Sequence, residues 1–314
     1  MTGEPVLVVD LGSDAGPESA AASASARTAL ARLPCPSAAL GAALASPAAA
    51  ELVEHFDVVV ADEAELAPVL ATVRRTPLAA TALVQLLRHS AGLDVHAGLI
   101  AESLVYSTLQ SGPEFGAWMA DQSARPPRKE DLEPAVLVHR QSDRLELTLN
   151  RPRKHNAFSA EMRDGLVEGL RIAVGDPSIA EVVVRGAGPS FSSGGDLDEF
   201  GTLPDPATAH AIRSTRNPAR LLAECADRVR FEVHGACVGA GAELPAFAHR
   251  VAAAEDAFFL LPEVSMGLVP GAGGTVSIPR RIGRQRTAQL ALSGRRLDAE
   301  TAWRWGLVDE LRTS

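Results

Sequence analysis

The 314-residue chain has few aromatic residues, few cysteines and almost no lysine. Phe, Trp and Tyr make up 4% of the residues, so we do not expect a surface that stacks on bases or sugars. The only lysines are Lys129 and Lys154, and 39 acidic residues outnumber 30 basic ones to give a net charge of −9. This balance provides no basic field for nucleic acid or anionic lipid, and we expect neither as a partner.

Other absences concern metals, disulfides and targeting signals. Cys35, Cys225 and Cys237 are too few and too widely spaced for a disulfide framework, and no Cys/His cluster has zinc spacing, so we expect no metal ion. The acidic start MTGEPVLVVDLGSD lacks the basic region of a signal peptide. No uncharged run is apolar enough to predict a membrane span. We therefore expect a soluble protein in a reducing, cytoplasmic compartment.

Composition divides the chain into an N-terminal region (residues 1–120), a polar, proline-bearing linker (121–134) and a C-terminal region (135–314). In the C-terminal region, strand-like apolar runs alternate with amphipathic helical segments, which predicts an α/β layer with helices covering a sheet. Its predicted strands are a hairpin over 135–150 and runs at 181–188, 229–235 and 250–256. Its predicted helices cover 162–174, 221–228 and 241–249. In the N-terminal region we predict strands at 5–11 and 56–62, a helix at 18–33, and helical structure over 81–120 with breaks at Gly92 and 111–113.

The segment SFSSGGDLDEF (residues 190–200) is the first that suggests chemistry. Gly194 and Gly195 follow a predicted strand, and glycines let a ligand approach the main chain closely. Exposed N–H groups at such a turn can hold an anion or a polarised carbonyl oxygen. An ordinary glycine turn before an acidic helix start would have the same sequence, so this segment alone does not establish a site.

Two glutamates, Glu243 and Glu263, are the candidate proton carriers. In HGACVGAGAEL (residues 234–244), Ala240 and Glu243 are one helical turn apart, so the carboxylate shares a face with the first free N–H groups of the helix. Glu263 lies in an apolar stretch, where burial would raise its pKa and suit a general acid. The alternatives are close helix–sheet packing with a solvated Glu243, and a loop Glu263 that points to water.

Taken in order, these segments resemble the crotonase (enoyl-CoA hydratase/isomerase) superfamily. NRPRKHNAFS (150–159) is similar to its N-terminal signature, and the two glycine-rich loops are similar to its oxyanion loops. LLPEVSMGLVPGAGGT (260–275) is similar to its second-glutamate segment, and residues 291–311 are similar to the stretch that closes its core. The resemblance covers residues 136–311. It implies an α/β fold with a crotonase-like spiral of ββα turns, preceded here by an N-terminal segment that runs from α/β to helical.

The resemblance also implies a substrate and roles for residues. The substrate is an acyl-CoA thioester whose oxygen is held by the N–H groups of Gly195 and Ala240. Glu243 deprotonates a water and Glu263 protonates the α-carbon, so that water adds syn to a trans-2-enoyl-CoA. The implied lining of the CoA and acyl channel is His155, Ala157, Ser193, Gly194, Asp196, Leu197, Gly239, Pro262 and Gly271. CoA arrives as part of the substrate, so no separate cofactor is expected, and the family implies a homo-oligomer, either a trimer or a hexamer.

Several departures from the family pattern keep other functions open. Leu260 and Leu261 stand where hydratases have Gly-Gln, so we expect a different floor of the acyl pocket. Pro245 falls in the second turn of the predicted Glu243 helix, where it removes a hydrogen bond and should kink the helix. Ala240 replaces a usual glycine but keeps its N–H. Isomerisation, thioester hydrolysis, decarboxylation, cofactor-free oxygenation and a non-catalytic partner subunit remain alternatives to hydration.

The N-terminal region is the largest departure. Family members continue beyond the segment GLVDEL with helices that close the site, whereas here only three residues follow it. Residues 76–122 resemble those closing helices, with the Glu102 helix, a break at 111–112 and a final aromatic helix. Residues 39–66 also resemble 233–259 weakly, either as a degenerate copy or through shared alanine-rich composition. Our hypothesis is a permuted or duplicated arrangement, which requires residues 80–120 to lie near Glu243 and Glu263.

Overall fold

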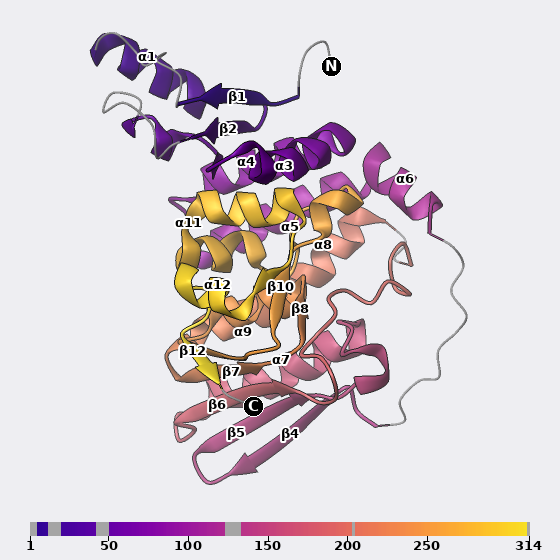
Figure 1. The fold of residues 1–314 in the computed structure, drawn as a ribbon. Helices are drawn as coiled ribbons and strands as arrows, with labels where there is room; N and C mark the ends of the chain where they lie inside the picture. Colours follow the sequence, from indigo (N-terminus) through magenta and orange to yellow (C-terminus); the bar gives the residue numbers. More distant parts are fainter. Residues whose placement is uncertain (1–4, 12–19, 42–49, 123–132, 203–204, 313–314) are drawn as a thin grey trace.

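The computed structural model describes residues 5–11, 20–41, 50–122, 133–202 and 205–312. Its largest sheet has six strands in the order β12-β9-β7-β6-β5-β4 (Figure 1). Their bounds are β4 Val136–Gln141, β5 Arg144–Leu149, β6 Glu181–Gly186, β7 Val229–Val233, β9 Arg250–Ala254 and β12 Glu310–Arg312. Only the β4–β5 pair is antiparallel, and the other neighbours in this sheet are parallel.

The burial of these strands follows their sequence. In β5, Leu145, Leu147 and Leu149 point inward and alternate with more exposed residues, as period-2 patterning requires. The central residues of β6, from Val182 to Val184, are buried on both faces because the sheet is covered there. The predicted hairpin and the strand at 181–188 are therefore confirmed. Helix α7 (Ala160–Gly175) begins where the Ser159 side chain accepts a hydrogen bond from the Met162 N–H.

A second, small sheet positions the segments that bear Glu243 and Glu263. It has the order β11-β10-β8, formed by β8 (Ala236–Val238), β10 (Phe258–Leu260) and β11 (Leu297–Asp298). The sequence did not predict these strands, because two or three residues are too few to show a periodicity. The helical elements of this region are α8 Pro206–Thr215, α9 Pro218–Glu224, η4 Ala226–Arg228, α10 Ala240–Glu243, η5 Pro245–Phe247, η6 Glu263–Met266, α11 Gly274–Ser293 and α12 Ala299–Trp305.

The predicted helix over residues 241–249 is wrong. Helix α10 is a single turn, and a 3-10 turn, η5, begins at Pro245. Proline has no N–H to continue the α-helical ladder, so the chain changes helix type instead of bending a longer helix. The long helix α11 is interrupted at Gly283, whose φ of 80° and ψ of 160° are not helical.

The N-terminal region combines a parallel sheet with a helical layer. Its strands pair in the order β1-β2-β3, and Gly92 and residues 111–112 separate its helices as predicted. The bounds are β1 Leu7–Asp10, α1 Ala20–Ala31, β2 Ser37–Leu40, η2 Val53–His55, β3 Val58–Val60, α3 Glu63–Arg75, α4 Pro77–Ser90, α5 Val95–Gln110 and α6 Pro113–Ala120. The sequence missed β2 and α3. Parts of the predicted helix at 18–33, of the linker and of the repeat at 39–66 lie outside the described residues.

Helices α3, α4 and α5 lie against α11 of the C-terminal region (Figure 1). Leu83 and Val84 of α4 belong to the same buried cluster as Val276 and Ile278 of α11. At the edge of this contact, Arg284 Nη1 of α11 donates to Oδ1 of buried Asp57 at 2.9 Å. The two regions therefore share one hydrophobic core. No helix in the described part of the chain is long and apolar enough to cross a membrane.

Candidate active site

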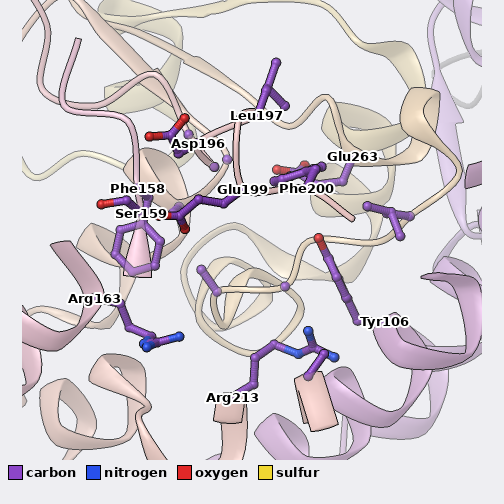
Figure 2. Close-up of a pocket in the computed structure, with 18 of the residues that line it drawn as sticks. Tyr106, Phe158, Ser159, Arg163, Asp196, Leu197, Glu199, Phe200, Arg213 and Glu263 are labelled. Atoms are coloured by element: carbon purple, nitrogen blue, oxygen red, sulfur yellow. The ribbon is translucent and has the colours of Figure 1, made fainter. Parts of the chain in front are cut away.

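A cavity of about 710 Å³ lies where the two regions meet. Its wall combines the loop at 193–201 with parts of α5, α6, α8, α10 and η6. Figure 2 shows part of this wall, with Tyr106, Arg213 and Glu263 among the labelled residues. Both predicted glutamates line it, and so do Glu102 and Tyr106 of the N-terminal helix α5. Residues from the 80–120 segment thus reach the cavity, as the permutation hypothesis requires, while the permuted ancestry itself stays a prediction.

The two glycine-rich loops are tied together beside this cavity. Ser192 N–H donates to Ala236 O, and Val238 N–H donates to Ser192 O, both at 3.0 Å. Gly194 has a φ of 86°, and a Cβ there would lie 3.0 Å from Val238 O, so only glycine fits without strain. Among the described residues, no acceptor takes a hydrogen bond from the N–H of Gly195 or of Ala240. The loops therefore present two unused donors to the cavity.

Glu243 is held at the start of α11. Its side chain is almost fully buried, and Oε2 accepts hydrogen bonds from the N–H groups of Ala272 and Gly274, each at 2.8 Å. Burial and the nearby charges of Glu263 and Glu102 raise the pKa of Glu243 well above its usual value, while the two N–H donors oppose that rise. These donors fix the carboxylate in one orientation on the cavity wall.

Glu263 has a different environment. It begins η6, and its Oε2 is shielded from solvent without a hydrogen-bond partner among the described residues. Burial raises the pKa of Glu263 to about 8, and the charge of Glu102 adds to this effect. At neutral pH this carboxyl group is therefore mostly protonated and can act as an acid.

A third carboxylate, Glu102, joins the N-terminal region to the same loop. Its Oε1 accepts from Gly273 N–H at 2.7 Å, and its Oε2 accepts from the Thr275 N–H at 2.9 Å and the Thr275 hydroxyl at 2.7 Å. Glu243 and Glu102 thus bind alternate N–H groups from Ala272 to Thr275. Burial raises the pKa of Glu102 to about 7, despite these hydrogen bonds. The sequence marked the Glu102 helix but not this contact, which joins residues 171 positions apart.

All of the predicted substrate-binding residues lie on the cavity wall: His155, Ala157, Ser193, Gly194, Asp196, Leu197, Gly239, Pro262 and Gly271. Asp196 is not free to bind a ligand cation, because Arg151 Nη2 lies 2.8 Å from its Oδ2. Burial would raise the pKa of Asp196, but its hydrogen bonds to Arg151 and to the Asp198 N–H lower the pKa below the usual value. Asp196 therefore holds the loop at 193–201 in place.

Leu260 and Leu261 do not line the cavity, so the expectation that they change its floor is wrong. Leu261 is fully buried in the core. Leu260 ends β10, where its carbonyl accepts the Gly239 N–H at 2.9 Å. Their positions in the small sheet direct both residues into structural contacts.

Sequence reasoning missed the aromatic part of the wall. Phe115 and Trp118 of α6 pack with Phe200, at ring-centroid separations of 5.9 to 6.3 Å. Tyr106 and Arg213 face the cavity from α5 and α8 (Figure 2). No local pattern could have identified this group, because its members come from segments far apart in the chain.

We expect Gly239→Ala to reduce activity strongly. Gly239 has a φ of 50°, and a Cβ there would lie 2.5 Å from Glu263 Oε1, so the alanine would displace the acid. We expect kcat to fall about 100-fold, which is the size of effect that a misplaced catalytic group produces. Gly116→Ala is the matched control, because a Cβ at Gly116 would have no atom of the described residues within 4 Å. Unchanged kcat in Gly239→Ala would contradict this role for the loop.

The buried carboxyl groups predict how stability depends on pH. Because the pKa of Glu263 is about 8 in the folded protein and 4.5 is its ordinary value, the folded state binds more protons between these limits. Stability should therefore fall as pH rises from about 5 to 8, by up to about 1.4 kcal/mol per pH unit for one group. In urea denaturation over this pH range, the free energy of unfolding of Glu263→Gln should fall less steeply with pH than that of wild type. The same pH dependence in variant and wild type would contradict the raised pKa.

The fold and the site together define a crotonase, with two loop N–H donors and two glutamates on one acyl cavity. A family model described as enoyl-CoA hydratase/isomerase matches residues 140–313, and the chain belongs to this family. It is 37% identical over 177 residues to the 1,2-epoxyphenylacetyl-CoA isomerase of Escherichia coli (strain K12), covering 55% of this chain and 68% of that protein. It is 36% identical over 178 residues to the 2,3-dehydroadipyl-CoA hydratase of the same strain, covering 56% and 68%.

The solved structures agree with this assignment. The enoyl-CoA hydratase of Thermoplasma volcanium GSS1 matches with a TM-score of 0.53 and 34% identity, over 57% of this chain and 72% of that chain. The enoyl-CoA hydratase of Mycobacterium smegmatis matches with a TM-score of 0.53 and 29% identity, over 58% and 71%. The crotonase-like ββα spiral core predicted from the sequence is therefore confirmed, and the family's acyl-CoA chemistry applies to this chain.

Proposed function

We propose that the protein adds water to 2-enoyl-CoA thioesters. The observation that carries this proposal is the pair of glutamates, Glu243 and Glu263, on one cavity wall beside the unused N–H groups of Gly195 and Ala240. Hydration needs a base for the water, an acid for the α-carbon and donors for the thioester oxygen. A relative that is 36% identical is a 2,3-dehydroadipyl-CoA hydratase, which supports this reaction class.

The proposed step uses each group once. Glu243 takes a proton from water as the hydroxyl oxygen bonds to the β-carbon, and Glu263 gives its proton to the α-carbon. The electron pair of the double bond passes through an enolate whose oxygen accepts hydrogen bonds from Gly195 and Ala240. Each such donor is worth about 3 kcal/mol in comparable sites. Proton exchange with solvent then returns both carboxyl groups to their starting states.

Hydrogen bonding distinguishes the two glutamates and supports this division of roles, whereas burial raises the pKa of both. Glu243 accepts two N–H hydrogen bonds, which favour its charged, basic form. Glu263 Oε2 has no such donor among the described residues, which favours its protonated, acidic form. CoA arrives with the substrate, so we propose no separate cofactor. A trimeric or hexameric assembly and a cytoplasmic location stay predictions.

Double-bond isomerisation is the second candidate. A relative that is 37% identical is a 1,2-epoxyphenylacetyl-CoA isomerase, so isomerisation of a CoA thioester, there of an epoxide, occurs in a relative as similar as the hydratase. The same carboxyl groups could move a proton from one carbon to another without adding water. Hydration uses both glutamates in one turnover, whereas a proton shift needs only one of them at a time.

The test is a panel of 2-enoyl-CoA and 3-enoyl-CoA thioesters, followed by loss of the conjugated thioester absorbance and by product analysis in deuterated water. Hydration predicts a 3-hydroxyacyl-CoA with deuterium at the α-carbon. Conversion of 3-enoyl-CoA into 2-enoyl-CoA without a hydroxylated product would favour isomerisation and contradict the hydratase proposal.

A further inference from the structure

One cation on the cavity wall, Arg213, forms no ion-pair contact with a described residue, and the charge of Glu102 acts on it only from beyond contact distance. Lysine and arginine side chains line the cavity at four positions: Lys154, Arg163, Arg213 and Arg216. Three of them form ion pairs within 3.2 Å, namely Lys154 with Asp198, Arg163 with Asp164, and Arg216 with Glu168. Arg213 forms no ion pair with any described residue and is partly buried. A partly desolvated guanidinium without a carboxylate in contact is stabilised further when a ligand supplies one.

Neutral groups hold Arg213 in place. Its Nε donates to the Ser103 hydroxyl at 3.1 Å, its Nη1 donates to Gln110 Oε1 at 3.3 Å, and its Nη2 donates to the Ser107 hydroxyl. Ser103, Ser107 and Gln110 all belong to α5, so the N-terminal region orients this side chain. One Nη1 hydrogen remains without an acceptor among the described residues, and it is available to a ligand.

Tyr106 extends this feature toward the reaction centre. The Arg213 guanidinium carbon lies 4.6 Å from the Tyr106 ring centroid, and the ring packs so closely on Gly271 that a Cβ there would collide with it. The ring is therefore fixed, and its hydroxyl points into the cavity on the side of Glu263 (Figure 2). The hydroxyl has no hydrogen-bond partner among the described residues. Burial raises the pKa of Tyr106, so the hydroxyl stays a donor at neutral pH.

We propose that Tyr106 and Arg213 form a subsite for a carboxylate at the far end of the acyl chain. Preferred substrates would then be enoyl-CoA thioesters of short dicarboxylic acids, a substrate class that rests on the proposed hydratase function. The guanidinium N–H and the phenolic O–H supply two donors, and one of them carries the complementary charge.

The position of the subsite indicates the acyl chain as the source of the anion. Tyr106 and Glu263 line the same cavity, and the Tyr106 hydroxyl is directed toward Glu263 (Figure 2), so the subsite lies on the side of the reacting carbons. Leu99 of α5 and Ala209 and Ile212 of α8 line the cavity nearby and suit a few methylene groups. The phosphates of CoA are separated from the thioester by the long pantetheine arm, which places them farther from the glutamates.

The first test compares two six-carbon 2-enoyl-CoA substrates, one ending in a methyl group and one in a carboxylate. We expect wild type to have a higher kcat/KM for the carboxylate substrate. The preference is the kcat/KM for the carboxylate substrate divided by that for the methyl substrate. Arg213→Gln should lower this preference about 30-fold and Tyr106→Phe about 10-fold, as loss of charge-assisted hydrogen bonds does. Arg220→Gln, at an exposed position of α9, is the control and should keep the wild-type ratio. Equal use of both substrates by wild type would overturn the proposal.

Two further measurements test whether Arg213 binds a carboxylate or a phosphate, and whether the subsite and the hydratase proposal fail separately. With pantetheine thioesters, which lack the CoA diphosphate and ribose phosphate, the effect of Arg213→Gln should persist, and its disappearance would assign Arg213 to a phosphate instead. Calorimetric binding of saturated six-carbon thioesters needs no turnover. Tighter, Arg213-dependent binding of the dicarboxylic form without any hydration would retain the subsite and refute the hydratase. Hydration of both substrates without a preference for the carboxylate would retain the hydratase and refute the subsite.

Discussion

Glu263→Gln is expected to lower kcat for 2-enoyl-CoA hydration about 1,000-fold, the usual range for loss of a general acid. The amide keeps the size of the carboxyl group but cannot deliver a proton to the α-carbon. Because Glu263 Oε2 has no hydrogen-bond partner among the described residues, the substitution breaks no contact there, and KM should change only a few-fold. Rates are measured by loss of the conjugated thioester absorbance.

Two comparisons make this result specific. Glu243→Gln should also be severely impaired, because it removes the base that activates water. Glu300→Gln, at an exposed position of α12, carries the same chemical change away from the cavity and should behave as wild type. A Glu263→Gln enzyme with kcat within a few-fold of wild type would refute the acid role. Circular dichroism and thermal melting check that each variant is folded.

Glu102→Ala is expected to impair both stability and catalysis. The substitution leaves the buried N–H groups of Gly273 and Thr275 without their acceptor, which should cost about 3 kcal/mol in the free energy of unfolding. The same loop donates to Glu243 through Ala272 and Gly274, so its movement should lower kcat as well. Urea denaturation measures the first effect and the hydration assay measures the second.

Glu102→Gln separates these effects from the loss of charge. Its amide oxygen can still accept from one of the two N–H groups, so we expect a smaller loss of stability than for alanine. If the glutamine and alanine variants were both as stable and as active as wild type, the contact between α5 and the start of α11 would have no role in holding the site. That outcome would also weaken the hypothesis that the N-terminal helices complete the active site.

Local sequence predicted the C-terminal core well because its signals are short-range. The hairpin at 135–150 alternates with period 2, and the glycine turns precede helix starts, so each unit can be inferred within a few residues. Glu243 and Glu263 were predicted as proton carriers because each stands in a distinctive local setting, and both line the cavity. The errors also have local causes. The helix predicted over 241–249 was wrong because Pro245 outweighs the helical propensity of its alanine-rich surroundings.

The N-terminal region was harder to interpret because its function depends on what it contacts. Helical periodicity in α4 and α5 shows that each helix buries a face, but not which partner that face meets. Sequence resemblance suggested that this segment closes the site, and the structure shows Glu102 and Tyr106 on the cavity wall. The hydrogen bonds from Gly273 and Thr275 to Glu102 could not be inferred from spacing, since they cross 171 or more positions.

The sequence by itself indicated the family, through several short motifs in the family's order, and the resemblance then predicted the two loop donors and the two glutamates. Such motifs depend on residue type and on spacing within one strand–loop–helix unit, which a single chain displays directly. Only the tertiary structure decided that a third carboxylate shares the α11 loop, and that Arg213 faces the cavity without an ion-pair partner among the described residues. Burial and charge pairing are properties of surroundings, and these surroundings form only when the N-terminal helices pack against the core.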